Sequence, residues 1–305
     1  MSIIIKGITK LYGAQKAVNN LSFSVNKGEI VGFLGPNGAG KSTTMKMITG
    51  YLVPDQGEAT VCGINVLMHP LEVKRKIGYL SEANPLYYEM YVKEYLDFIA
   101  GIHKVKNCKR KIDEVIELTG LSIEQKKKIG QLSKGYKQRT GLAAALIHDP
   151  EVLILDEPTS GLDPNQIIEI RNVIRDQGQN KTVLFSSHIL QEVQALCERV
   201  IIINKGNLVA DDKLQNLQKS GSTNVIKVSF SENIEKEKLA QIAGLSAIIQ
   251  IDSNSWQIKG DNTNSIKKQL MELSLQQGFN IVSLQTEGGS LEEIFRTLTT
   301  NEKTT

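Results

Sequence analysis

Cysteine is scarce in this chain of 305 residues. The three cysteines, Cys62, Cys108 and Cys197, are an odd number, lie far apart and form no Cys-x-x-Cys pair. A disulfide framework or a thiolate zinc site needs paired cysteines, so the sequence excludes both as the basis of the fold. We expect these thiols to serve as small apolar side chains, buried or half-buried.

Long hydrophobic runs are missing as well. The longest uncharged apolar stretches, 142–147 and 152–155, are far shorter than the roughly 18 residues that a membrane-spanning helix needs. The N-terminus, Met-Ser-Ile-Ile-Ile-Lys-Gly, has no basic segment followed by a long apolar core, so it does not resemble a secretory signal. We therefore expect a cytoplasmic protein in which no segment crosses a bilayer.

Neither sign of charge dominates. Lys and Arg total 36 against 33 Asp and Glu, and a net charge of +3 indicates no nucleic-acid surface. Hydrophobic residues make up 40% of the sequence, enough for a core in each of the two domains that this length predicts at about 150 residues per domain. The composition is that of an ordered protein, and its charge identifies no partner.

Short apolar strands, glycine turns and amphipathic helices alternate over the first two hundred residues. This pattern predicts an α/β domain with a largely parallel sheet flanked by helices. The predicted strands are 3–5, 21–25, 29–34, 152–156, 182–186 and 200–203. Between Pro85 and His148 the apolar residues recur at helical spacing, which predicts a helical subdomain at about 85–150.

A polar stretch at 215–224, which includes Gly221, Ser222 and Thr223, has no periodicity and predicts a linker. We therefore expect one domain at 1–215 and a second at 216–305. The βαββαβ order of elements in the second domain indicates a small α+β, ferredoxin-like sandwich. Its strands are predicted at 225–230, 247–251, 255–259 and 279–285, its helices at 234–243 and 265–277, and a last helix capped by Ser290 at 290–298.

A glycine-rich loop follows the predicted strand at 30–34. It satisfies the pattern G-x-x-x-x-G-K-[ST] and consists of Gly35, Pro36, Asn37, Gly38, Ala39, Gly40, Lys41, Ser42 and Thr43. Inward-facing backbone N–H groups and the N-terminus of the following helix make such a loop a cradle for phosphates. Lys41 reaches the β- and γ-phosphates, and the Ser42 hydroxyl is placed to ligate Mg²⁺. The sequence therefore predicts an ATP site with a P-loop NTPase fold.

Two carboxylates, Asp156 and Glu157, end the buried strand 152–156. Open parallel sheets bind ligands at the edge where the carboxyl ends of the strands meet. Asp156 is thus expected in the Mg²⁺ shell, and Glu157 is expected to polarise an attacking water. In isolation an acidic pair at a strand end is as easily a solvated turn, and the phosphate loop in the same chain is what favours the catalytic interpretation.

At this point the sequence resembles the ATP-binding subunits of ABC transporters over about residues 1–215. The segment Leu132-Ser133-Lys134-Gly135-Tyr136 is similar to the family signature Leu-Ser-Gly-Gly-Gln, with Lys and Tyr at two of its positions. The Ser133 hydroxyl and the Gly135 N–H at the start of a helix also make an anion site on physical grounds. The resemblance implies that they contact the γ-phosphate.

Other family positions are matched in order along the chain. Ser160-Gly161-Leu162-Asp163 resembles the loop at the dimer interface, and His188 resembles the switch histidine that contacts the γ-phosphate. Tyr12 matches the aromatic residue that stacks on adenine. Glu82 stands where the family usually has a glutamine that touches Mg²⁺, and a carboxylate is also a suitable ligand for that ion.

The resemblance implies an ATPase that works as a pair of copies sandwiching two ATP molecules, with Mg²⁺, and drives a membrane permease. It places the chain at the inner face of the cell membrane as a peripheral subunit. A single ATPase unit with a small C-terminal domain is similar to exporter subunits, and residues 84–98 look most like the gliding-motility-associated type.

Two alternatives stay open at this point. One is a soluble ABC-type ATPase acting on a ribosome or a nucleic-acid complex. The single phosphate loop and the short separation of Lys41 from Ser133 argue against it, because those relatives carry two ATPase units or a long coiled coil. The other concerns the C-terminal domain, which stabilises or regulates the dimer or is simply a packed appendage.

Overall fold

The computed structural model describes residues 1–220, 225–287 and 291–300. Within these ranges the chain divides into two compact units, Met1–Leu214 and Gln215–Thr300, which are described separately below. No helix among the described residues is both long and apolar enough to span a membrane.

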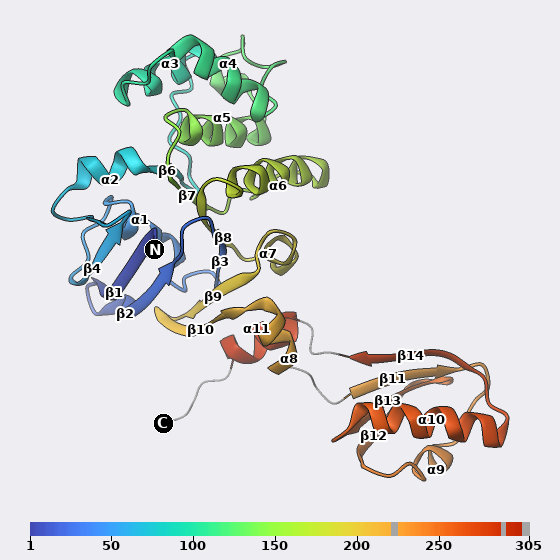
Figure 1. Cartoon of the computed structure of the whole chain (residues 1–305). Coiled ribbons are helices and arrows are strands. Elements are labelled where there is room, and N and C mark those ends of the chain that lie inside the picture. The colour runs from blue at the N-terminus through green and yellow to red at the C-terminus, as the bar shows by residue number, and fades with distance from the viewer. Residues whose placement is uncertain (221–224, 288–290, 301–305) are drawn as a thin grey trace. The chain divides into compact units, whose positions relative to one another are not determined.

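The first unit contains two sheets and most of the helices (Figure 1). Its strands are β1 (Ile3–Tyr12), β2 (Gln15–Val25), β3 (Ile30–Leu34), β4 (Gln56–Val61), β5 (Ile64–Asn65), β6 (Ile77–Leu80), β7 (Val152–Asp156), β8 (Thr182–Ser187), β9 (Arg199–Asn204) and β10 (Asn207–Lys213). Its helices are α1 (Lys41–Ile48), α2 (Pro70–Lys76), α3 (Val92–Ile102), α4 (Cys108–Leu118), α5 (Lys134–Leu146), α6 (Pro164–Gly178) and α7 (Leu190–Leu196), with a 3₁₀ turn at Ile129–Gln131.

A six-stranded sheet forms the centre of this unit, in the order β10-β9-β3-β8-β7-β6. All neighbours are parallel except β9 and β10, which form an antiparallel pair at the edge. Strand β7 is buried along its whole length, as expected for a short apolar run in the middle of a parallel sheet. Because β3, β7 and β8 run in the same direction, the loops after them meet at one edge of the sheet.

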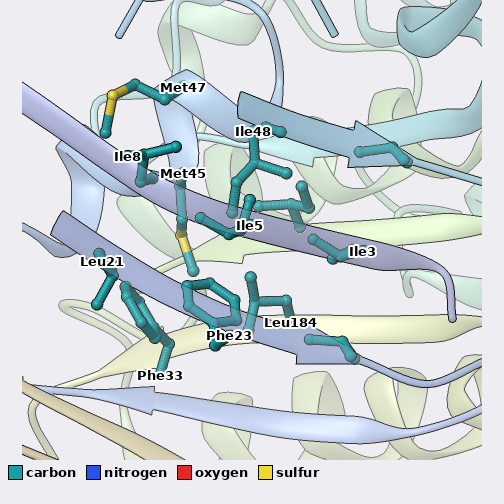
Figure 2. Close-up of a cluster of buried hydrophobic side chains, with 14 of the residues drawn as sticks. Ile3, Ile5, Ile8, Leu21, Phe23, Phe33, Met45, Met47, Ile48 and Leu184 are labelled. Carbon is teal, nitrogen blue, oxygen red and sulfur yellow. The ribbon is translucent and has the colours of Figure 1, made fainter. Parts of the chain in front are cut away.

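A second, antiparallel sheet, β2-β1-β4-β5, packs against this centre. Ile3 and Ile5 lie on the buried side of β1, and Ile8 is buried as well because the register with β2 shifts between Ile5 and Ile8. All three belong to the same core cluster as Phe33 of β3 and Met45 of α1 (Figure 2). Phe23 and Phe33 lie with their ring centres 5.5 Å apart. Helix α1 is therefore fixed between the two sheets, and so is the loop that leads into it.

Helices α3, α4 and α5 form the helical subdomain, drawn in green in Figure 1. Ser133 caps α5 through its hydroxyl, which accepts from the Tyr136 N–H at 3.3 Å. Asp163 caps α6 in the same way and is followed by Pro164, a residue favoured in the first helical turn. Both helix starts are thus set by local sequence.

The second unit begins with α8 (Leu214–Ser220) and ends with α11 (Leu291–Thr300). Between them lie β11 (Val225–Phe230), α9 (Lys236–Leu239), β12 (Leu245–Asp252), β13 (Ser255–Gly260), α10 (Thr263–Gln277) and β14 (Ile281–Glu287). The antiparallel order β12-β13-β11-β14 is that of a ferredoxin-like sandwich. This strand order confirms the predicted fold class, and the core of the unit includes Trp256, Ile258 and Leu270.

Several sequence predictions need correction. Residues 215–220 are helical rather than an irregular linker, since Leu214 and Leu217 are buried three positions apart. The helix predicted at 234–243 covers only 236–239. The antiparallel sheet and strands β6 and β10 were not predicted. Gly221 to Thr223 and the cap Ser290 lie outside the described residues.

Candidate functional site

The phosphate loop connects β3 to α1. Gly40 precedes the helix with φ at 105°, a conformation that favours glycine, and a Cβ there would collide with the carbonyl of Ala17. The Ala39 carbonyl accepts from the Gly206 N–H at 2.9 Å, and the Ala39 N–H donates to the Pro36 carbonyl at 3.1 Å. The loop is therefore held in a fixed curve by neighbouring backbone.

The Lys41 ammonium lies inside this curve. Its Nζ donates to the Gly35 carbonyl at 2.7 Å and lies 3.4 Å from the Pro36 carbonyl. The Glu157 Oε1 is 3.7 Å from the same nitrogen. Lys41 is only 6% exposed, so the charge is held by oxygens that the oxygens of a phosphate could replace.

Glu157 follows β7 in a strained backbone conformation. Its φ is 50°, which is uncommon for a residue with a side chain and costs roughly 1–2 kcal/mol. The Glu157 N–H donates to the Ser186 Oγ at 2.9 Å, and that hydroxyl donates to the Asp156 Oδ1 at 2.6 Å. Ser186 therefore fixes both carboxylate residues, a role that the sequence analysis missed.

A signal for Ser186 was present in the sequence. Strand β8 is buried throughout and ends in two serines, and Asp156 pairs with Ser186 in the parallel register. A buried hydroxyl beside a buried carboxylate is expected to be its hydrogen-bond partner.

His188 lies directly against Glu157. Its Nδ1 is 2.8 Å from the Glu157 Oε2. Because an ionised carboxylate only accepts, Nδ1 carries the proton in this contact, and a neutral ring then presents a lone pair at Nε2. To donate to a phosphate through Nε2, the imidazole would need a second proton or a change of tautomer.

These groups line one cavity of about 560 Å³. Its walls include Asn37 to Thr43 of the loop, Glu82, Glu157, Ser160 and His188. Tyr12, at the end of β1, also lines it and is 52% exposed, as an aromatic platform for a ligand would be. The structure thus brings Tyr12, the phosphate loop, Glu157 and His188 together, while Gly35 and Pro36 face Lys41 through their carbonyls.

The three predicted metal ligands also converge. Ser42 and Glu82 line this cavity, and both line a neighbouring cavity of about 680 Å³ together with Asp156. Hydroxyl and carboxylate oxygens are the donors that Mg²⁺ prefers. The residues present therefore fit this ion, although no group of three or more His, Cys, Asp or Glu among the described residues is placed to hold a metal by itself.

The signature residues lie elsewhere. Ser133 and Gly135 stand at the start of α5 and are absent from the lining of both cavities. Ser133 is exposed, and the structure does not bring it or Gly135 to the phosphate loop of the same chain.

The neighbouring cavity contains a stacked pair of histidines, His103 and His148, with ring centres 3.8 Å apart and planes 14° apart. The His148 Nε2 donates to the Ile77 carbonyl at 3.0 Å. Its Nδ1 is buried, with no hydrogen-bond partner among the described residues. Burial, and secondarily His103, lower the pKa of His148 from its ordinary value of 6.5 to about 4.

Comparisons with known proteins agree with this geometry. The family model described as ABC transporter matches residues 18–160. The bacitracin transport ATP-binding protein BcrA of Bacillus licheniformis is 36% identical over 97% of this chain and 97% of its own length. The linearmycin resistance ATP-binding protein LnrL of Bacillus subtilis (strain 168) is 34% identical over 96% of this chain and 97% of its own.

Solved structures are similar as well. A structure described as an ATP-binding subunit of an ABC transporter gives a TM-score of 0.67 at 28% identity, over 72% of this chain and 93% of its own. The ATP-binding cassette MJ0796, dimeric and bound to ADP and Pi after hydrolysis, gives 0.65 at 25% identity, over 70% and 98%. The similarity therefore extends from sequence to fold.

Proposed function

Because this chain belongs to the ATP-binding, ATP-hydrolysing subunits of ABC transporters, we propose that it powers an exporter whose membrane-spanning subunit is a separate chain. Two relatives similar over nearly the whole length are named for bacitracin transport and linearmycin resistance, which favours export. The resemblance of residues 84–98 to a gliding-motility type has no counterpart in these names, so the proposal stops at an exporter.

The observation that carries the proposal is the placement of Glu157 beside Lys41 and His188 at the phosphate loop. In the proposed reaction the loop N–H groups and Lys41 bind the β- and γ-phosphates of ATP, displacing Lys41 from the Gly35 carbonyl. Glu157 then accepts a proton from the water that attacks the γ-phosphorus, while the bond from that phosphorus to the β–γ bridging oxygen breaks and ADP leaves with the oxygen. Ser186 keeps this carboxylate oriented through the Glu157 backbone.

Mg²⁺ would be held by Ser42, Asp156 and Glu82. When bound, it supplies charge neutralisation for the phosphates. Glu82 is exposed and lies in the segment that leads from β6 to the helical subdomain. It also lines the 680 Å³ cavity, together with the other two proposed metal ligands. We propose that the membrane subunit contacts this surface, between Glu82 and Tyr95, and thereby keeps the chain at the inner face of the membrane.

A dimer completes the proposed site. Ser133 and Gly135 lie outside the chain's own cavity, and a similar cassette is dimeric in its solved structure. In the proposed pair, the hydroxyl and N–H of one copy meet the γ-phosphate held by the other. Tyr12, which lines the cavity and is about half exposed, would stack on the adenine.

The test is Glu157→Gln, which keeps the shape of the side chain and removes the base. We expect ATP to stay bound, turnover to fall by roughly 10²–10⁴-fold, as for loss of a general base, and an ATP-dependent dimer to accumulate. Steady-state phosphate release and sedimentation velocity with ATP and Mg²⁺ measure these effects.

Lys41→Ala is the companion variant. It removes the cation inside the loop, so we expect weak nucleotide binding and no dimer. Normal turnover of Glu157→Gln, or unchanged ATP affinity of Lys41→Ala, would place the chemistry on other residues.

A further inference from the structure

Helix α6 contacts the signature segment at its first turn. Gly135 is buried, and the Gln166 side-chain amide fills the space that a Cβ at Gly135 would need. Gln166 is itself held, since its backbone N–H donates to the Asp163 Oδ1 at 2.9 Å in the helix cap. The position of Gly135 is therefore set by a side chain from another element.

A second contact lies one turn further along both helices. The Arg139 guanidinium on α5 forms an ion pair with Glu169 on α6 and also donates to the Thr119 carbonyl at 3.1 Å. Its carbon Cζ lies 5.6 Å from the centre of the Tyr136 ring. Arg139 is 6% exposed, so loss of Glu169 would leave a buried cation with fewer acceptors.

A third contact joins the loop before α6 to the signature. The Lys134 side chain lies over Gly161, where a Cβ would meet its Nζ. Gly161 has φ at 73°, so the backbone of this loop also favours glycine. The three contacts follow one another along α5, from Lys134 through Gly135 to Arg139.

Helix α6 is also fixed by buried residues of its own and by its short connection to Glu157. Ile170 and Ile174 are buried, and the chain reaches α6 only a few residues after Glu157. The contacts thus connect the start of α5, in the helical subdomain, to the segment that carries the carboxylates of the phosphate site. A displacement of α6 would change where Ser133 and Gly135 stand relative to Glu157.

We propose that Gln166 and Glu169 are positioning residues for the signature: by holding Gly135 and Arg139, they fix the surface that one copy presents to the ATP of the other. This inference rests on the proposed function, because it assigns the contacts to the dimeric site. It predicts that breaking the Arg139–Glu169 pair weakens ATP-driven pairing while binding of ATP by the single chain is unchanged.

The experiment uses the full chain carrying Glu157→Gln as the parent, with and without Glu169→Gln. The dimer dissociation constant at saturating ATP and Mg²⁺ is measured by sedimentation. The affinity of the single chain for a fluorescent ATP analogue is measured below the pairing concentration. We expect Glu169→Gln to raise the dimer constant about fivefold, in the range of one ion pair, and to leave nucleotide affinity unchanged.

Glu114→Gln is the matched control, since it removes an Arg–Glu ion pair on α4 that is exposed to solvent. It should change neither constant. If Glu169→Gln pairs as well as its parent, the positioning role is wrong and the proposed function stands. Should nucleotide affinity and thermal stability fall together with pairing, the ion pair is structural only, which also overturns the inference. A parent chain that never pairs with ATP would instead refute the dimeric site itself.

Discussion

The half-buried ring of His148, whose Nδ1 atom is fully buried, makes the stability of the first unit depend on pH. The folded chain keeps this imidazole neutral because its Nδ1 faces no acceptor among the described residues and its ring is stacked on His103. The pKa is lowered from 6.5 to about 4, with burial as the main cause. Protonation is therefore easier in the unfolded chain, and the folded state loses stability as the pH falls.

The magnitude follows from the two pKa values. The stabilisation of the folded state is complete above pH 6.5, declines as the unfolded chain takes up the proton, and stops declining below about pH 4. The whole difference corresponds to about 3 kcal/mol, of which roughly 2 kcal/mol is lost by pH 5. His103 adds a loss in the same direction, because burial and Arg75 lower the pKa of its ring too.

Urea unfolding at pH 7.5 and pH 5 measures this loss, followed by far-UV circular dichroism. The difference between the two pH values is compared for the wild type, His148→Gln and His69→Gln. Glutamine does not titrate, so His148→Gln should lose about 2 kcal/mol less on acidification than the wild type. Trp256, the one tryptophan in the sequence, lies in the second unit, so its fluorescence reports that unit separately.

For each variant we compare the change in the free energy of unfolding between pH 7.5 and pH 5, and not its absolute value. Removing the ring also removes its stacking and therefore changes stability at every pH. His69 is exposed and lies 3.8 Å from Glu72, so it matches the residue type without the burial. Equal acid losses in the wild type and His148→Gln would refute the reasoning, and so would an equal reduction in His69→Gln.

Two further predictions concern the phosphate site and the second unit. Ser186→Ala removes the acceptor of the Glu157 N–H and the donor to Asp156. We expect the free energy of unfolding to fall by about 1–3 kcal/mol, measured by urea unfolding, and kcat to fall, measured by phosphate release. An unchanged kcat would contradict the orienting role of Ser186. If the second unit stabilises the dimer, a chain that ends at Leu214 should pair more weakly with ATP, which sedimentation measures. Unchanged pairing and turnover would show that the second unit has no role in the dimer.

Sequence patterns predicted the elements whose residues repeat a local rule. Strand β7 was predicted with both of its ends, because Val152 begins an uninterrupted apolar run and Asp156 closes it. The phosphate loop was predicted from the spacing of its glycines, Lys41 and Ser42 between a predicted strand and a helix, because the curve of its backbone depends on residues within the loop. The order of elements in the second unit was also predicted, because each of its strands and helices has its own local apolar pattern.

Features that depend on distant partners were missed. Strand β4 begins with three exposed residues, Gln56, Gly57 and Glu58, so its alternation is weak, and its pairing with β1 and β5 is what makes it a strand. Ser186 belongs to no motif, and its role arises from the register with Asp156. Gln166 and Glu169 look like ordinary solvated residues of an amphipathic helix until α5 is placed beside them.

The backbone at Glu157 has a consequence for how this site tolerates change. Glycine or asparagine would occupy that conformation at lower cost, so selection for thermal stability alone would remove glutamate from position 157. Engineering that ranks substitutions by predicted stability would therefore favour replacing the residue proposed to activate water. We therefore expect a variant of position 157 with higher thermal stability to have a lower rate of ATP turnover.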